Sequence, residues 1–285
     1  MIKIIVAESG STKTKWMVID KTHKKIDYTI VTTGINPFFM QAGQITKTIR
    51  DQWDNQIDPA DITKVFFYGA GCSTKTKCEL VKKGLSSFFK SSKVYVNHDL
   101  LAAAKALLGE KDGIAAILGT GSNSCLYING EIRENVYSLG YFFGDEGSGA
   151  HIGKMLIKNF LKDRLPADLH NAFMAQYTMN KEQILDRVYN KPNPNRFLAK
   201  FAIFAGKHLE SEYMQKLVFH CFSEFFSEQI MQYSSYKKHR ICFTGSVAYH
   251  FRDILEKAAS HHGLSISSIL QNPAEKLAKY HIDTL

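Results

Sequence analysis

Cysteine is scarce in this chain of 285 residues, and the five cysteines present follow no metal-binding or disulfide pattern. Only Cys72 and Cys78 lie near each other, and their spacing fits no common zinc site. We therefore expect free thiols in a reducing compartment. Proline is also rare, at 6 residues, and 45% of the residues are hydrophobic. That composition excludes a disordered or collagen-like chain.

Long hydrophobic runs are missing as well. The first apolar run covers only the four residues 4–7, too few for the apolar core of a signal peptide. No stretch approaches the roughly 18 apolar residues that a membrane span needs. We expect a soluble, cytoplasmic protein with no membrane partner.

The charge is unbalanced, because 36 basic residues outnumber 27 acidic ones and leave a formal net charge of +9. Such a charge attracts nucleic acid, an anionic membrane surface or phosphorylated small molecules, and the net charge alone does not choose among them. No helix-turn-helix, zinc finger or aromatic RNA-binding motif stands out, so we do not expect a nucleic-acid partner.

Neither common phosphate-binding fingerprint is present, since both the P-loop and the dinucleotide motif after the first strand are absent. Two polar tips stand in their place, at residues 8–12 and 119–124, and each joins one predicted strand to the next. Glycine and small hydroxyl residues let backbone N–H groups approach an anion. An offset of 111 places Gly10 on Gly121 and aligns the flanking strands, which indicates a duplicated α/β domain.

The chain length agrees with two domains at about 150 residues each. We predict an N-terminal domain of residues 1–110 plus 271–285, and a second domain of residues 111–270 with a helical insertion. Apolar periodicity predicts these strands and helices. The strands are 2–7, 14–19, 26–32, 65–68, 94–96, 114–118, 126–128 and 241–243, and the helices include 41–53, 100–108 and 273–285. Residues 190–195 are expected to form a loop.

Three polar residues outside the tips are candidates for chemistry. Asp99 follows a predicted strand and precedes a helix, so it is either a helix cap or a general base at the ligand-binding edge of a sheet. Asn36 lies in a turn after the third strand. Asp145 belongs to the glycine-rich loop 144–149, where a carboxylate either favours a helix N-terminus or binds sugar hydroxyls.

Four motifs occur in a characteristic order: Glu8-Ser-Gly-Ser-Thr-Lys13, Gly119-Thr-Gly-Ser-Asn123, Gly144-Asp-Glu-Gly-Ser148 and Thr244-Gly-Ser-Val247. Together they resemble the N-acetylglucosamine kinases and the related BadF/BadG-type ATPases, in the superfamily of actin and hexokinase. The resemblance spans residues 2 to about 282. It implies an α/β protein with two tandem ribonuclease-H-like (actin-like ATPase) domains and an interdomain cleft.

The resemblance also implies roles for individual residues. Asp99 matches the catalytic base and contacts the sugar, and Glu8 is expected near Mg²⁺, through water. The positions that match ATP-binding residues are Gly10, Ser11, Thr12, Lys13, Thr120, Gly245 and Ser246. The other positions that match sugar-binding residues are Asn36, Ser122, Asn123, Gly140 and Asp145. The implied ligands are ATP, Mg²⁺ and an amino sugar, most readily N-acetylglucosamine. A homodimer is compatible with the sequence.

Some residues depart from the family pattern. Many members of the superfamily have aspartate where this chain has Glu8, and the kinases often have Gly-Trp-Gly where it has Ser138-Leu-Gly-Tyr141. The identity of the sugar therefore stays open. Two other functions stay open with it, an ATPase that drives a conformational change in a partner and a non-catalytic sugar- or nucleotide-sensing regulator.

Overall fold

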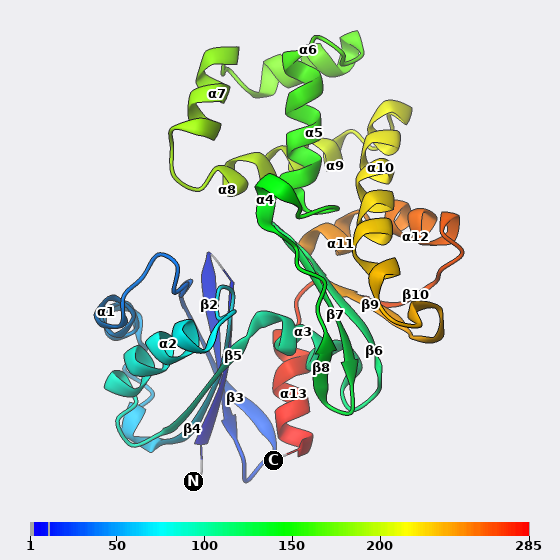
Figure 1. Ribbon diagram of the computed structural model, residues 1–285. Coiled ribbons are helices and arrows are strands. Elements are labelled where there is room, and N and C mark those ends of the chain that lie inside the picture. The colour runs from blue at the N-terminus through cyan, green and yellow to red at the C-terminus, as the bar shows by residue number, and fades with distance from the viewer. Residues whose placement is uncertain (1–2, 11, 285) are drawn as a thin grey trace. The chain divides into compact units, whose positions relative to one another are not determined.

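The chain folds into two compact units, residues 1–110 with 273–285 and residues 111–272. This computed structural model describes residues 3–10 and 12–284. Each unit is built on its own five-stranded sheet with helices packed against it (Figure 1).

The sheet of the first unit has the strand order β3-β2-β1-β4-β5. Its strands are β1 (Lys3–Ser9), β2 (Lys13–Asp20), β3 (Lys25–Thr33), β4 (Ile62–Gly69) and β5 (Lys93–His98). The first three strands pair antiparallel, and β4 and β5 extend the sheet in parallel from β1. The carboxyl ends of β1, β4 and β5 therefore lie at one edge, where α/β proteins bind ligands.

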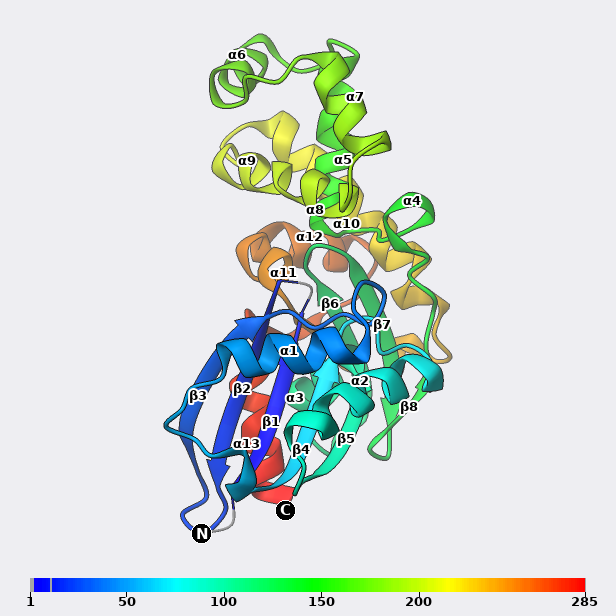
Figure 2. The ribbon, with the colours of Figure 1, turned by 90° about the vertical axis from the view of Figure 1, so that its left-hand side faces the viewer.

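Helices cover both faces of this sheet. They are α1 (Ala42–Gln52), α2 (Lys75–Phe88), α3 (Asp99–Leu108) and α13 (Ala274–Thr284), and a short 3₁₀ helix, η1, covers Pro59–Asp61. One face packs on α1 and α2, and the other packs on α3 and α13 (Figure 2). The alternation of buried residues along β1 explains this arrangement, because Ile5 faces one core and Ile4 the other.

The sheet of the second unit repeats the plan, with the strand order β10-β9-β6-β7-β8. Its strands are β6 (Gly113–Leu118), β7 (Ser122–Ile128), β8 (Glu131–Glu134), β9 (Ile241–Thr244) and β10 (Ile266–Leu270). Again three strands pair antiparallel and two extend the sheet in parallel. The prediction of two tandem ribonuclease-H-like domains is confirmed by this equivalence of the two sheets.

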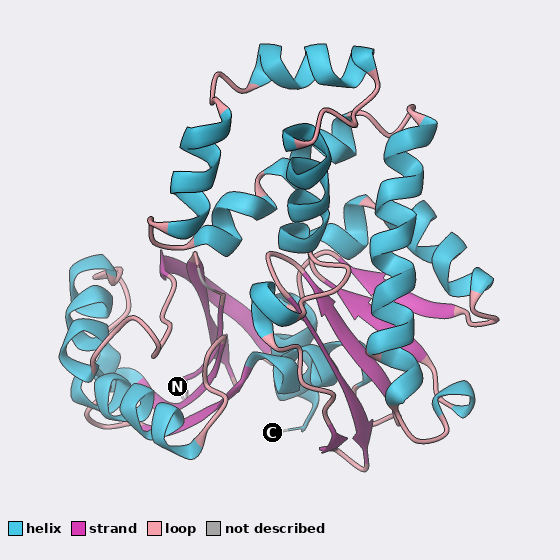
Figure 3. Cartoon of the chain, turned by 45° about the horizontal axis from the view of Figure 1, so that its top comes forward, coloured by secondary structure: helices cyan, strands magenta, loops and turns pink. Residues whose placement is uncertain are grey.

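Helices make up most of the remainder of the second unit. They are α4 (Gly140–Phe143), α5 (Gly149–Leu161), α6 (Ala167–Gln176), α7 (Lys181–Tyr189), α8 (Pro194–Ala199), α9 (Phe201–Lys207), α10 (Glu212–Glu228), α11 (Ser246–His250) and α12 (Arg252–His261), with the 3₁₀ helices η2 (Ile230–Gln232) and η3 (Tyr236–Lys238). Figure 3 shows the helices and strands of both units by type. Phe222, Phe225 and Phe226 place α10 in the same apolar core as Phe243 of the sheet. The loop predicted over 190–195 ends early, because α8 begins at Pro194, where proline is favoured in the first turn.

No helix in the described part of the chain combines the length and the apolar character that crossing a bilayer requires.

Candidate active site

Two carboxylates lie at the ligand-binding edge of the first unit. Glu8 is the next-to-last residue of β1, and Asp99 is the first residue of α3, directly after β5. Burial, together with the negative charge of Asp99, raises the pKa of Glu8 to about 7, although the ammonium groups of Lys13 and Lys15 act in the opposite direction. The structure therefore brings the predicted base and the predicted metal-binding residue into one electrostatic cluster.

Asp99 has a titratable neighbour, His98, that sequence reasoning does not single out. Its Oδ1 atom lies 2.8 Å from Nδ1 of His98, and the same nitrogen lies 3.0 Å from the N–H of Leu100. Burial alone would lower the pKa of His98. The hydrogen bond to Asp99 and the negative charge of Asp99 together outweigh burial, so the pKa of His98 is raised. When Nδ1 carries a proton it donates to Asp99, and when it does not it accepts from Leu100.

Asn36 stands on a loop that is tied to the end of β1. The Ser9 hydroxyl, which is buried, accepts a hydrogen bond from the N–H of Ile35 at 2.9 Å. The Asn36 side chain accepts a bond from the N–H of Phe38 at 2.9 Å. A Cβ atom on Gly71, which has φ +82°, would lie 2.5 Å from Asn36 Oδ1. Gly71 therefore gives Asn36 its space, and neither Ser9 nor Gly71 is singled out by the sequence.

The first polar tip is a narrow turn between β1 and β2. The N–H of Gly10 donates to the carbonyl of Lys13 at 3.1 Å, and the N–H of Gly34 donates to the carbonyl of Thr12 at 3.0 Å. Thr12 and Lys13 are exposed, so their hydroxyl and ammonium groups are accessible to an anion. Ser11, also predicted here, lies outside the described residues.

The second polar tip begins the corresponding hairpin of the second unit. Thr120 is exposed, and its carbonyl accepts the N–H of Ala150 at 3.0 Å, which fixes the tip to the start of α5. The Ser122 hydroxyl is buried and has no hydrogen-bond partner among the described residues. The Asn123 Oδ1 atom accepts from the N–H of Ser124 at 2.9 Å and from the side chain of Asn135 at 3.0 Å. An unpaired buried hydroxyl is costly, so Ser122 is suited to bind a polar ligand.

Asp145 projects from a strained loop toward this tip. Its φ is +57°, an unusual value for a residue with a side chain. Its carboxylate is buried and accepts the N–H of Ser122 at 3.2 Å, and burial raises its pKa to about 6. Gly140, at the start of α4, lies in the segment whose Ser138 carbonyl accepts the N–H of Asp145 at 2.9 Å.

The turn after β9 completes the second half of the site. Gly245 has φ +117°, and a Cβ atom there would lie 2.2 Å from the carbonyl oxygen of Leu118. Only glycine fits this approach of the turn to β6. Ser246 follows as the exposed first residue of α11, while the hydroxyl of Thr244 is buried with no partner among the described residues.

The comparisons with known proteins can be set beside this geometry. A crystal structure from Porphyromonas gingivalis, of a protein provisionally named N-acetylglucosamine kinase, matches with a TM-score of 0.93 and 39% identity. The match covers 98% of this chain and 99% of that chain. This chain belongs to the N-acetylglucosamine kinase-like family.

More distant structures share the fold. A protein from Chromobacterium violaceum, also provisionally named N-acetylglucosamine kinase, matches 98% of this chain and 99% of its own with 14% identity and a TM-score of 0.71. A provisionally named N-acetylmannosamine kinase from Listeria monocytogenes covers 99% of both chains with 14% identity and a TM-score of 0.51. No protein-family model matches the sequence. No curated protein matches it.

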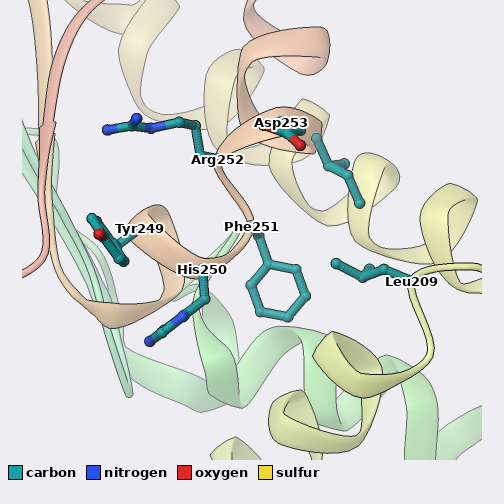
Figure 4. A pocket seen from close by; sticks show the side chains of 7 residues that line it. Leu209, Tyr249, His250, Phe251, Arg252 and Asp253 are labelled. Carbon is teal, nitrogen blue, oxygen red and sulfur yellow. The ribbon is translucent and has the colours of Figure 1, made fainter.

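This member of the N-acetylglucosamine kinase-like family has a pocket just beyond the Gly245 turn. It holds about 280 Å³ and is lined by Leu209 and by residues 249–254 (Figure 4). The Arg252 guanidinium lies 5.8 Å from the centre of the Tyr249 ring, and Figure 4 shows both side chains on the side of the pocket away from Leu209. The pocket escapes sequence reasoning because its aromatic and basic residues form no recognisable motif.

A buried histidine braces the Asp145 loop. The His151 Nδ1 atom accepts the N–H of Gly147 at 3.1 Å, and its Nε2 atom lies 3.2 Å from a carboxylate oxygen of Glu224 in α10. Burial lowers the pKa of His151 to about 4, with the charges of Lys154 and His220 acting in the same direction. The neutral ring therefore donates to Glu224 and accepts from Gly147.

The predicted residues thus form one cluster in each unit. Glu8, Asp99 and the first tip belong to the first unit, and the second tip, Asp145 and the Gly245 turn belong to the second. Among the described residues, no group of three or more histidine, cysteine or acidic side chains could hold a metal. Glu8 and Asp99 still suit Mg²⁺, which usually takes one or two carboxylates and keeps several waters.

Proposed function

We propose that this protein is a sugar kinase that transfers the γ-phosphoryl group of ATP to the 6-hydroxyl of N-acetylglucosamine. The observation that carries the proposal is the likeness, at 39% identity over 98% of this chain, to the Porphyromonas gingivalis protein. The carboxylates of the first unit and the hydroxyl-rich tips of both units support it, because they are the groups that phosphoryl transfer requires.

The sugar would be held mainly by groups that bind hydroxyls. Asp145 offers a buried carboxylate as an acceptor, and Ser122 offers a hydroxyl that has no partner among the described residues. Asn36, Asn123 and Gly140 would complete this contact surface. A hydroxyl group of a ligand can both donate a hydrogen bond to the Asp145 carboxylate and accept one from the Ser122 hydroxyl. These two side chains therefore suit a polyhydroxylated ligand better than a purely anionic one.

Asp99 would act as the general base. As the oxygen of the 6-hydroxyl forms its bond to the γ-phosphorus, the bond from that phosphorus to the ADP oxygen breaks. The hydroxyl proton passes to the Asp99 carboxylate. Catalysis of this kind depends on positioning and charge neutralisation more than on covalent chemistry.

The nucleotide would use both tips. In this proposal Gly10, Ser11, Thr12 and Lys13 hold phosphates from one side, Thr120 meets them from the other, and Gly245 and Ser246 pack on adenosine. Because the tips belong to different units, the function requires the units to enclose ATP and sugar in one cleft. Enclosure excludes water and limits wasteful hydrolysis of ATP.

Glu8 would hold Mg²⁺ through a water molecule. The raised pKa of Glu8 fits this role, because a nearby divalent cation favours its ionised form and offsets the cost of burial. When bound, Mg²⁺ neutralises the charge on the phosphate oxygens.

The base is tested by Asp99→Asn, which keeps the shape of the side chain and removes its basicity. We expect sugar-dependent ADP release to fall at least about 100-fold, while ATP affinity measured by calorimetry changes less than about threefold. Full turnover in Asp99→Asn would show that another group takes the proton.

The sugar pocket is tested by Asn36→Ala and Asp145→Ala. Each should raise KM for the sugar by about tenfold or more and leave KM for ATP nearly unchanged, because each removes a side chain proposed to bind the sugar and none proposed to bind ATP. Unchanged sugar KM in both variants would exclude the proposed pocket.

A further inference from the structure

A second cavity of the second unit has none of the residues assigned to ATP, sugar or Mg²⁺ in its lining. It is a groove of about 340 Å³ between α5 and α7, and one end is closed by Tyr141 and Phe142 of α4. Its remaining apolar lining consists of Ile157, Leu161, Ile184, Leu185, Val188, Tyr189 and Leu198. A concave, mainly apolar cavity of this size is typical of a binding site for a small molecule.

Every charged residue that lines the groove is a lysine. Lys154 and Lys158 lie four residues apart in α5, and Lys162, four residues further on, is the residue that caps its C-terminus. The three therefore lie on one side of the helix, each about 6 Å from the next. Two carboxylates that neighbour the lining residues in the sequence pair with lysines outside the lining, Asp163 with Lys181 and Asp186 with Lys191. None of the ion pairs among the described residues uses a lysine of the groove. The groove therefore has positive charge along one wall and no acidic residue in its lining.

The opposite wall and the end are apolar and unusually open to water. Leu185 is 44% exposed, Tyr189 is 75% exposed and Phe142 is 67% exposed. Large apolar side chains gathered at one place on a surface usually mark a binding site. An occupant with an apolar body would remove this surface from water, and burial of apolar surface stabilises a complex.

We propose that the groove between α5 and α7 binds a small amphipathic anion, with its apolar body on the groove floor and its phosphate, sulfate or carboxylate group at Lys158 and Lys162. A small molecule suits the site better than a protein, because protein interfaces usually cover about 800 Å² on each partner and are flatter. Lys154 is already partly used, since its ammonium group donates to the carbonyl of Tyr141 at 3.3 Å. The binding site is independent of the proposed kinase reaction.

Calorimetric titration of the full chain with decyl phosphate, below its micelle concentration, tests the site directly. Inorganic phosphate and decanol are titrated in parallel, because each has one half of the proposed chemistry. We expect one molecule of decyl phosphate to bind per chain, with decanol and inorganic phosphate each at least tenfold weaker. Equal binding of decanol, or no saturable binding of decyl phosphate, would overturn the proposal.

Charge reversal locates the site. Lys158→Glu combined with Lys162→Glu should weaken decyl phosphate at least about tenfold, since it replaces two favourable charges with two unfavourable ones. The matched control is Lys237→Glu with Lys238→Glu, which makes the same charge change at an exposed turn outside the groove lining and should leave the affinity unchanged. Equal losses in the two double variants would show that only net charge matters, and would overturn the site.

Two further measurements separate other occupants. Light scattering of wild type and of the Lys158/Lys162 double variant should give the same mass. A mass that falls in the variant would make the groove an interface between copies and overturn the proposal. In sedimentation with vesicles of phosphatidylglycerol, the wild-type protein should bind the vesicles no more than the Lys237/Lys238 control variant does. Vesicle binding without binding of free decyl phosphate would assign the groove to a membrane surface instead.

Discussion

Glu8 carries its charge at a position where burial opposes ionisation. Its pKa of about 7 lies above the ordinary value for glutamate, so the folded state holds a proton that the unfolded chain releases more easily. Between the two pKa values the unfolded state binds fewer protons, and the free energy of unfolding therefore falls as the pH rises from about 4.5 to about 7. Ionising the buried Glu8 carboxylate lowers the stability of the folded protein. Carboxylates with pKa values shifted in this way are common at functional sites.

This cost predicts the effect of Glu8→Gln. The variant should be more stable than wild type by about 2 kcal/mol at pH 8 and by much less at pH 5, because glutamine has no charge to bury. Urea unfolding at the two pH values measures the difference. Glu110→Gln, at an exposed position, is the control and should change stability by less than about 0.5 kcal/mol at either pH. A pH-independent effect of Glu8→Gln would mean that Glu8 is ionised without penalty.

Some single residues of the candidate site can be predicted from the sequence, and others cannot. Asp99, Asn36 and Asp145 can be predicted as candidates, because Asp99 and Asn36 follow predicted strands and Asp145 belongs to a glycine-rich loop. Ser9 and Gly71 cannot, because their importance comes from contacts with Ile35 and Asn36, far away in the chain. The pairing of His98 with Asp99 joins neighbours, but its geometry depends on how α3 begins.

At the level of elements, α10 supports the loop that carries Asp145. Glu224 receives the His151 hydrogen bond from one side, and Gln229, just after α10, donates to Glu146 at 3.3 Å. The N-terminus of α5 is capped by the Ser148 hydroxyl, which accepts the N–H of His151 at 3.1 Å. The loop between α4 and α5 is thus held to α10 by two contacts, one through His151 and one through Glu146.

His151→Leu tests this support. It leaves the N–H of Gly147 without its acceptor, so we expect sugar KM to rise about tenfold and stability to fall by about 2 kcal/mol. KM for ATP should change less than about twofold. His220→Ala is the matched control, because His220 contacts the same Glu224 but is 60% exposed on its side chain. It should leave both KM values unchanged.

His151→Gln separates positioning from general destabilisation, because glutamine can still accept from Gly147. Its sugar KM should lie within about threefold of wild type. If His151→Leu lost stability with no change in sugar KM, the histidine would support the core and not the loop.

Elements differ in how visible they are in the sequence. The strands β1, β6 and β9 are continuous apolar runs and are predictable for that reason. The edge strands β8 and β10 are not, because Glu131–Glu134 and Ile266–Leu270 contain polar residues and depend on pairing with a neighbouring strand. The short helix α4 has no periodicity to reveal it, since it covers only Gly140–Phe143.

At the scale of the whole molecule, the chain returns to its first unit at the end. Helix α13 packs Ala274, Leu277 and Ala278 against Ile4 and Val6 of β1. The side chain of His281 lies 2.9 Å from the Tyr68 hydroxyl in β4. The last residues therefore complete a core that the first residues begin.

Leu277→Ala tests this closure. The substitution should lower the free energy of unfolding of the first unit by about 3 kcal/mol, because it leaves a cavity against the sheet. The two tryptophans of the chain, Trp16 and Trp53, both lie in the core of the first unit, so their fluorescence reports its unfolding selectively. Lys279→Ala on the same helix is exposed and should have little effect. An unchanged transition in Leu277→Ala would show that α13 adds little to the unit.

The duplicated architecture is what gives the proposed kinase two half-sites, and one measurement tests that function most directly. ADP release by the wild-type protein with ATP and Mg²⁺ is followed over a panel of amino sugars and plain hexoses, with a control that contains no sugar. Phosphorus NMR identifies the product. We predict rapid ADP release with N-acetylglucosamine, formation of N-acetylglucosamine 6-phosphate, and little ADP release without sugar. ADP release that is equally fast in the absence of any sugar would contradict this prediction and indicate an ATPase that serves another partner.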